Sequence, residues 1–342
     1  MHATHGQAEA EFPTEAKVRF LSEAGVYPDR PATVEVVETH MSWVFLADER
    51  AYKLKKPVAS DYFDFRTLSA RENNCRNEVR LNRRLAGDVY LGVARLTRGA
   101  GGGLALDGPG ETVDWMVVMR RLPQDRMLDR LIDRSALDWH ELERLGDRLA
   151  DFYAGLPPAA ITPQDYFDRF VRDQAINRKM LAACADAGFY EKVLDRLDAA
   201  LVAHAALLKE RVTDGRIVDG HGDLRPEHVC MTEPIVIFDC LEFSDALRRV
   251  DPVEELAFLG MECAMLDAAW VGPKLTSLVL ARLGQDVPQD LIALHTAFRA
   301  TLRARQTLSH LFDRVPRRPE RWWPLADRYA AAADLALTKL GV

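Results

Sequence analysis

The types of residue that predominate change near Leu122, and this change divides the sequence into two parts. Before it, short runs at 34–37 and 43–46 are rich in β-branched and aromatic residues, which indicates strands. After it, alanine- and leucine-rich segments separated by prolines indicate helices. One strand-like island, at 217–243, interrupts them. A sheet-rich lobe followed by a larger helical lobe is therefore expected, an α+β arrangement.

The domain boundaries that we predict follow this change. Residues 1–12 are expected to be a flexible tail, and residues 13–121 a sheet lobe with one helix. The helical lobe is expected over residues 122–342, with a loop of functional interest at 219–243.

Composition excludes several classes of protein. The 342 residues are enough for about two domains. Lys and Arg number 45 against 52 Asp and Glu, a net charge of −7 without a basic block, so we expect no nucleic-acid partner. No long uncharged apolar run indicates a membrane span, and the first residues do not resemble a secretory signal. Five scattered cysteines fit a reducing compartment, so we expect a cytoplasmic protein without a membrane partner.

The island carries the most informative motif. It reads HGDLRPEH at 221–228, and the apolar run PIVIF at 234–238 leads directly into Asp239. Phosphoryl transfer needs a carboxylate for the acceptor hydroxyl, oxygen ligands for metal ions and a cation on the nucleotide phosphates. Asp223 suits the first task. Asp239 suits the second, because a carboxylate ending an apolar strand is costly to desolvate without a metal or hydrogen-bond donors.

The upstream strand at 51–55 offers the cation. Its alternation sends Ala51, Lys53 and Lys55 to one face. This face is either an outer surface with solvated lysines or the site of a phosphate-binding lysine.

The helix expected near residues 69–86 offers a partner for that lysine. Helical periodicity places Glu78 within the apolar stripe, where a carboxylate needs a fixed cation. A lysine of the strand at 51–55 would supply that cation: the AxK pattern at 51–53, which resembles the phosphate-binding lysine strand of kinases, points to a Lys53–Glu78 ion pair, with Lys55 as the second candidate. The alternative is that Glu78 reaches solvent or pairs with Arg80 or Arg83.

Together these motifs resemble a known family. The run at 221–228 is similar to the catalytic loop of protein-kinase-like phosphotransferases, H-x-D followed by four residues and Asn. With Asp239 and the AxK pattern at 51–53, the sequence resembles the aminoglycoside phosphotransferase family, which includes choline and sugar-amine kinases. It is most similar, at 239–243 and 251–258, to an uncharacterised bacterial branch that is sometimes fused to a C-terminal P-loop ATPase domain. No GxxxxGK[ST] motif occurs here, so we expect that domain to be absent.

The resemblance implies a two-lobed protein-kinase-like fold with a small antiparallel-sheet N-lobe and a larger helical C-lobe. It implies an ATP- or GTP-dependent kinase that phosphorylates an alcohol group of a small molecule, such as an aminoglycoside-like compound, a sugar or an amino alcohol. Asp223 would orient and deprotonate that hydroxyl, and Lys53, held by Glu78, would bind the nucleotide phosphates. Arg225 would either neutralise the transferred phosphate or pair with Glu227.

The resemblance also implies where the nucleotide lies. The hairpin turn at 39–42 stands where kinases use a Gly-rich loop, and it contains no glycine. The Ser42 hydroxyl and nearby N–H groups would reach phosphate there, unless Ser42 is an ordinary turn residue. Backbone groups of Met119, Arg120 and Arg121 would meet the adenine edge.

The metal site departs from the family pattern. Where the family has Asn, this sequence has His228, and imidazole suits Mn²⁺ better than the expected Mg²⁺. His228 would ligate a softer metal, or bond phosphate or Asp223 while Asp239 and Glu242 hold the metal, or mark impaired metal binding. Glu242 is either a second metal ligand or a surface residue.

Two further residues are expected to support the loops. The resemblance implies that His221 ties the catalytic loop to the metal-loop backbone, and we expect Glu255 to anchor the metal loop.

The rival function is a catalytically weak nucleotide-binding regulator, a pseudokinase. His228 and the glycine-free first loop favour it, whereas the intact Lys53, Asp223 and Asp239 oppose it. A protein kinase is disfavoured, because the eleven residues between Asp239 and Asp251 leave no room for an activation loop.

Overall fold

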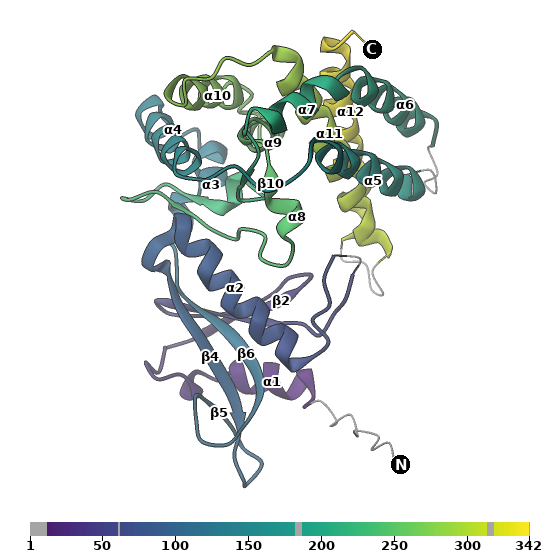
Figure 1. Ribbon diagram of the computed structural model, residues 1–342. Coiled ribbons are helices and arrows are strands. Elements are labelled where there is room, and N and C mark those ends of the chain that lie inside the picture. Colours follow the sequence, from purple (N-terminus) through teal and green to yellow (C-terminus); the bar gives the residue numbers. More distant parts are fainter. Residues whose placement is uncertain (1–11, 61, 182–186, 313–317, 342) are drawn as a thin grey trace. The chain divides into compact units, whose positions relative to one another are not determined.

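The computed structural model describes residues 12–60, 62–181, 187–312 and 318–341 (Figure 1). The chain forms two compact units. The first, here the sheet unit, contains the chain up to Pro123 together with Ile237–Ser244, and the second, here the helical unit, contains the rest. Apart from Phe12, the tail that we predict over residues 1–12 lies outside the described residues.

The sheet unit is built on a six-stranded antiparallel sheet. Its strands lie in the order β1-β2-β3-β6-β4-β5, so β3 pairs with both β2 and β6. Asp48, with φ of 47°, makes the tight turn between β2 and β3, a conformation that Asp tolerates better than most residues. The strands are β1 (Val34–Glu38), β2 (Ser42–Ala47), β3 (Arg50–Lys55), β4 (Tyr90–Arg98), β5 (Leu104–Leu106) and β6 (Glu111–Arg120).

Two helices accompany this sheet. Helix α1 (Thr14–Leu21) contributes Leu21 to the core formed by Phe45, Tyr52 and Leu54. Helix α2 (Leu68–Ala86) lies along β4 and β6 (Figure 1). Side chains alternate along β3, and Tyr52 and Leu54 face the core. Lys53 and Lys55 therefore point to the other side of the sheet, toward α2.

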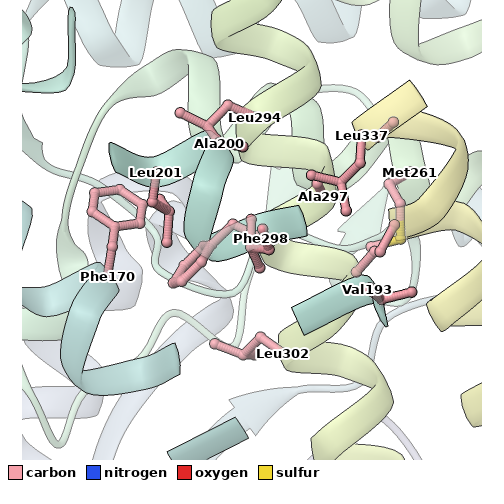
Figure 2. Packing of buried hydrophobic residues seen from close by; sticks show 14 of the residues in the cluster. Phe170, Val193, Ala200, Leu201, Met261, Leu294, Ala297, Phe298, Leu302 and Leu337 are labelled. Atoms are coloured by element: carbon pink, nitrogen blue, oxygen red, sulfur yellow. The ribbon is translucent and has the colours of Figure 1, made fainter. Parts of the chain in front are cut away.

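The helical unit contains a large apolar core formed by α5, α6, α9, α11 and α12. Figure 2 shows Phe298 of α11 packed among Phe170, Val193 and other apolar side chains of this core. The helices are α3 (Leu128–Asp133), α4 (Trp139–Ala154), α5 (Pro163–Leu181), α6 (Ala187–Ala203), α7 (Ala205–Thr213), α8 (Asp245–Arg248), α9 (Pro252–Met265), α10 (Val271–Arg282), α11 (Gln289–Ser309) and α12 (Trp322–Lys339).

The predicted strand island becomes several very short strands separated by loops. Strand β7 (Val218–Asp219) pairs antiparallel with β10 (Arg249–Val250), and β8 (Val229–Cys230) pairs with β9 (Val236–Ile237). Most of this segment is therefore loop, held between ordered elements.

Helices α9 and α10 cross where two glycines meet. A Cβ added at Gly260 would lie 2.7 Å from the Cα of Gly272, so the contact requires the absence of side chains on both helices. Within the described part of the chain, no helix is long and apolar enough to span a bilayer.

Candidate active site

The predicted ion pair between Lys53 and Glu78 is present in the sheet unit. Lys53 Nζ lies 3.0 Å from Glu78 Oε1 and 2.7 Å from Asp239 Oδ1. The alternative partners of Glu78 bond elsewhere: Arg80 contacts the Asn77 side chain, and Arg83 donates to the backbone carbonyls of residues 90 and 91. The lysine therefore joins the carboxylate of α2 to the aspartate predicted to bind metal.

Lys55 makes a parallel set of contacts that the sequence analysis did not predict. Its Nζ lies 2.5 Å from Glu78 Oε2 and 2.6 Å from Glu242 Oε1. The Lys55 side chain is 1% exposed and that of Glu242 5% exposed. Of the alternatives left open, two are excluded: this face of β3 is not a solvated surface, and Glu242 is not a surface residue.

The ion pairs of Lys53 and Lys55 join one cluster of charges with Glu78, Asp239 and Glu242. The charges of this cluster shift the pKa values of Lys53 and Glu78. Burial alone would lower the pKa of Lys53, but the carboxylates of Asp239 and Glu78 outweigh it and raise that pKa well above its usual range. Burial would likewise raise the pKa of Glu78, but Lys53 and Lys55 together lower it. These groups are therefore charged at neutral pH.

Backbone contacts hold Asp239 and its neighbour in the sheet unit. The Asp239 N–H donates to Tyr90 Oη at 3.3 Å, and the Cys240 N–H donates to Asn82 Oδ1 at 2.9 Å. Asp239 has a φ of +61°. Its side chain is 40% exposed, the most exposed of the carboxylates in this cluster.

The loop predicted to be catalytic, at 221–228, lies in the helical unit and is held by helix α9. Gly222 has a φ of +87°, which suits glycine. Glu255 accepts hydrogen bonds from the N–H groups of His221 and Gly222 and from the Tyr153 hydroxyl. The expectation that Glu255 anchors the metal loop is therefore wrong, because its carboxylate is taken up by the catalytic loop.

Asp223 lies beside two nitrogen groups of its own loop. Arg225 Nε is 3.1 Å from Asp223 Oδ2, and His228 Nδ1 is 3.7 Å from the same oxygen. Burial would raise the pKa of Asp223, but Arg225 and His228 outweigh it and lower that pKa. Arg225 also pairs with Glu227 at 2.6 Å, which agrees with the alternative in which it bonds that acid.

His228 uses both of its ring nitrogens within the loop. Nδ1 lies 2.8 Å from the Asp223 carbonyl oxygen, which can only accept, so Nδ1 carries the proton. Nε2 is then the acceptor for Arg225 Nη2 at 3.1 Å. These contacts agree with the alternative in which His228 bonds Asp223 rather than a metal.

The remaining predicted nucleotide contacts lie in the sheet unit. Ser42 begins β2 opposite Lys55, and its buried Oγ has no hydrogen-bond partner among the described residues. Met119 and Arg120 end β6, where the Arg120 side chain pairs with Asp88. The Arg121 N–H already donates to the Glu49 carbonyl at 2.8 Å.

The predicted catalytic loop has a second support that the sequence did not indicate. Arg299 of α11 donates to the Gly222 carbonyl at 3.3 Å and pairs with Glu254 at 2.8 Å. Glu254 also pairs with Arg169 and is fully buried. The signal was two adjacent acids, Glu254 and Glu255, in the first turn of a largely apolar helix.

No model of a known protein family matches the chain. It is 33% identical over 279 residues, 80% of its length, to uncharacterized proteins of Mycobacterium tuberculosis and Mycobacterium bovis. The chain spans about half the length, 54%, of these curated relatives.

Solved structures resemble the chain over nearly all of its length. A choline/ethanolamine kinase family protein from Mesorhizobium loti is 16% identical, with a TM-score of 0.51 over 93% of this chain and 99% of that one. Choline kinase LicA from Streptococcus pneumoniae is 14% identical, with a TM-score of 0.52 over 96% and 100%. The resemblance seen in the catalytic-loop motif is thereby confirmed at the level of the fold: the chain has the protein-kinase-like α+β fold of the choline and ethanolamine kinases.

Proposed function

We propose that this protein is a phosphotransferase that moves the terminal phosphoryl group of ATP or GTP to a hydroxyl of a small molecule. The observation that carries the proposal is the continuous contact from Glu78 through Lys53 to Asp239. In a kinase-like fold this arrangement places one cation for the phosphates beside one carboxylate for a metal ion. The choline and ethanolamine kinases that share the fold support the same class of acceptor.

Asp223 would bind the acceptor. Its lowered pKa keeps the carboxylate ionised, so it accepts a hydrogen bond from the hydroxyl and draws off the proton as the new P–O bond forms. Arg225, bonded to Asp223, would keep that carboxylate oriented and offer positive charge to the transferred phosphoryl group.

A divalent metal fits the residues present. Mg²⁺ is commonly bound by one or two carboxylates together with substrate phosphates and water, and the partly exposed carboxylate of Asp239 suits that mode. Among the described residues no group of three or more His, Cys, Asp or Glu gathers as a metal cage. The metal, when bound, would neutralise phosphate charge. Mn²⁺ remains an alternative through the nitrogen of His228, although that nitrogen already accepts from Arg225.

The nucleotide would lie over the turn before Ser42, with its base toward residues 119–121. The Ser42 hydroxyl is a hydrogen-bonding group in need of a partner, which a phosphate oxygen would supply. Since the Arg121 N–H is engaged with Glu49, the base would meet backbone groups of Met119 and Arg120.

The test is calorimetric titration of ATP and GTP, with Mg²⁺ and then Mn²⁺, on the wild-type protein and on Lys53→Met and Asp239→Ala. We expect metal-dependent binding in the wild type and loss of at least about tenfold in affinity in either variant. Arg50→Met is the matched control, because Arg50 is an exposed cation of the same strand, paired with Asp29. It should bind as the wild type does.

Transfer is then measured with choline, ethanolamine, hexose sugars and an aminoglycoside as acceptors. Phosphorylation of any of them supports the proposal. Metal-independent nucleotide binding without transfer would instead support the regulator, the second candidate. Absence of nucleotide binding in the wild type would overturn both.

A further inference from the structure

We infer that Lys55 and Glu242 form a positioning pair, which fixes the segment Asp239–Glu242 against helix α2 and so sets the place of the Asp239 carboxylate. The catalytic meaning of this pair rests on the proposed function. The structural part does not, because it concerns contacts within the sheet unit alone.

Five charged groups of the sheet unit alternate in sign along one line of contacts. Glu78 lies at the centre, and each of its two oxygens takes a different lysine of β3. Each lysine continues to a different acid of one short segment: Lys53 to Asp239 and Lys55 to Glu242. Lysines two residues apart on a strand share a face. Each of the two can therefore contact one oxygen of Glu78 and one acid of the segment.

Because Lys55 and its partners are buried, their charges have to stay paired. The side chains of Lys55 and Glu242 are 1% and 5% exposed, and that of Glu78 is fully buried. A charge removed from water is tolerated only when it is paired, so removal of one partner leaves the other uncompensated. Glu242 has to stay beside Lys55 for the segment to remain in place.

An independent set of contacts holds the same segment at its other end. The N–H groups of Asp239 and Cys240 donate to Tyr90 and Asn82, and Asn82 also donates to the Glu78 carbonyl. Asp239 takes a positive φ, a conformation that Asp tolerates better than most residues, so this turn needs no glycine. The segment is therefore fixed at both ends, and Lys55 supplies the fixation at Glu242.

This assignment separates Glu242 from a metal-ligand role. If Glu242 were a ligand, Lys55 would compete with the metal, and removing Lys55 would leave metal-dependent binding unchanged or stronger. If the pair positions Asp239, removing either member weakens that binding. The two roles predict opposite results for Lys55→Met.

The experiment is a double-mutant cycle with Lys55→Met, Glu242→Gln and the double variant, with Arg50→Met as the control. Hydrogen exchange, measured by mass spectrometry at residue resolution, follows the Asp239 and Cys240 amides in protein without nucleotide. We expect each single variant to raise the exchange rate of these two amides about tenfold or more. The double variant should exchange no faster than the faster of the two single variants, and the control should match the wild type. Circular dichroism identifies any variant that does not fold, and Glu242→Gln, which leaves Lys55 paired with Glu78, is the milder change.

Calorimetry with Mn²⁺ and ATP on the same proteins adds the functional result. Weaker metal-dependent binding in both singles supports positioning. Unchanged amide exchange in both singles, or tighter binding in Lys55→Met, would overturn it. A wild type that binds no nucleotide but whose variants show faster exchange would reject the proposed function and keep the positioning pair.

Discussion

Asp223 shows how one residue acquires a defined state from its own loop. Glu255 fixes the backbone before it, Arg299 holds the Gly222 carbonyl, and Arg225 bonds its carboxylate. The result is an ionised acid in a fixed position, because the charge of Arg225 outweighs the cost of burial. Such an acid is suited to orienting a hydroxyl, which is the task that the proposed reaction gives it.

Substitution Asp223→Asn tests this task directly. The amide keeps the shape but cannot take up a proton, so we expect transfer to fall by about 10² to 10⁴-fold. Nucleotide affinity should stay within about twofold, because Lys53 and Asp239, the groups proposed for the phosphates and the metal, are in the sheet unit and the substitution removes an interaction with the acceptor. Turnover with the best acceptor and calorimetry with ATP measure the two effects.

Asp195→Asn on α6 is the control, because Asp195 is 71% exposed and pairs only at the surface with Arg178. Full turnover in Asp223→Asn would remove this residue from the mechanism.

At the scale of elements, most of the sheet unit could be predicted from sequence. The alternation in β3 and the apolar stripe of α2 placed a lysine face and Glu78 correctly, because both patterns follow from local geometry, and the family resemblance selected Lys53 as the partner. In the sequence, Gly272 and Pro273 of helix α10 resemble a break. They lie instead in its first turn, where proline is tolerated.

The contact between α9 and α10 gives a prediction at this scale. Gly260→Ala places a Cβ against the backbone of Gly272, so the two helices have to separate. We expect a loss of about 1–3 kcal/mol in the free energy of unfolding. Urea denaturation measures it.

Gly188→Ala is the matched control. Gly188 lies in α6 with no atom within 4 Å of an added Cβ, so alanine should be neutral or slightly stabilising. Equal stability of the two variants would mean that the helices do not pack as closely as described.

At the scale of the whole molecule, sequence order concealed which parts belong together. Segment Ile237–Ser244 follows more than a hundred residues of the helical unit, yet it completes the sheet unit. Local patterns carry no information about such a return, so the partners of Lys55 and the true target of Glu255 were not predictable. The assignment of Asp223 rested on a motif, since spacing alone does not distinguish a catalytic acid from a surface one.

The buried ionisable groups of the helical unit predict how stability depends on pH. Burial lowers the pKa of His295 to about 4, against the opposing pull of Glu254 and Asp251 and with Arg169 and Arg299 nearby. Neither ring nitrogen has a hydrogen-bond partner among the described residues. The folded state therefore favours neutral His295, and this contribution is complete above pH 6.5 and lost as the pH falls toward 4.

We expect His295 to lower the free energy of unfolding by about 2 kcal/mol when the pH is lowered from 7.5 to 5. Glu254, whose pKa is lowered to about 2 because Arg169 and Arg299 outweigh its burial, should add a further loss below pH 4.5. Urea denaturation at several pH values measures the profile. His295→Leu should flatten it between pH 6.5 and pH 4, and an unchanged slope would assign the dependence to another group.

The late return of the chain to the sheet unit also orders events during synthesis. When the ribosome has released residues up to Pro123, the nascent sheet holds two inward lysines, Lys53 and Lys55, with Glu78 as their acid partner in the cluster. Asp239 and Glu242 have not yet been translated, so this early sheet lacks the anions that balance its interior. The amino-terminal unit would thus reach its final state only after the polypeptide has been extended beyond residue 244, which couples its maturation to translation of the helical segments between.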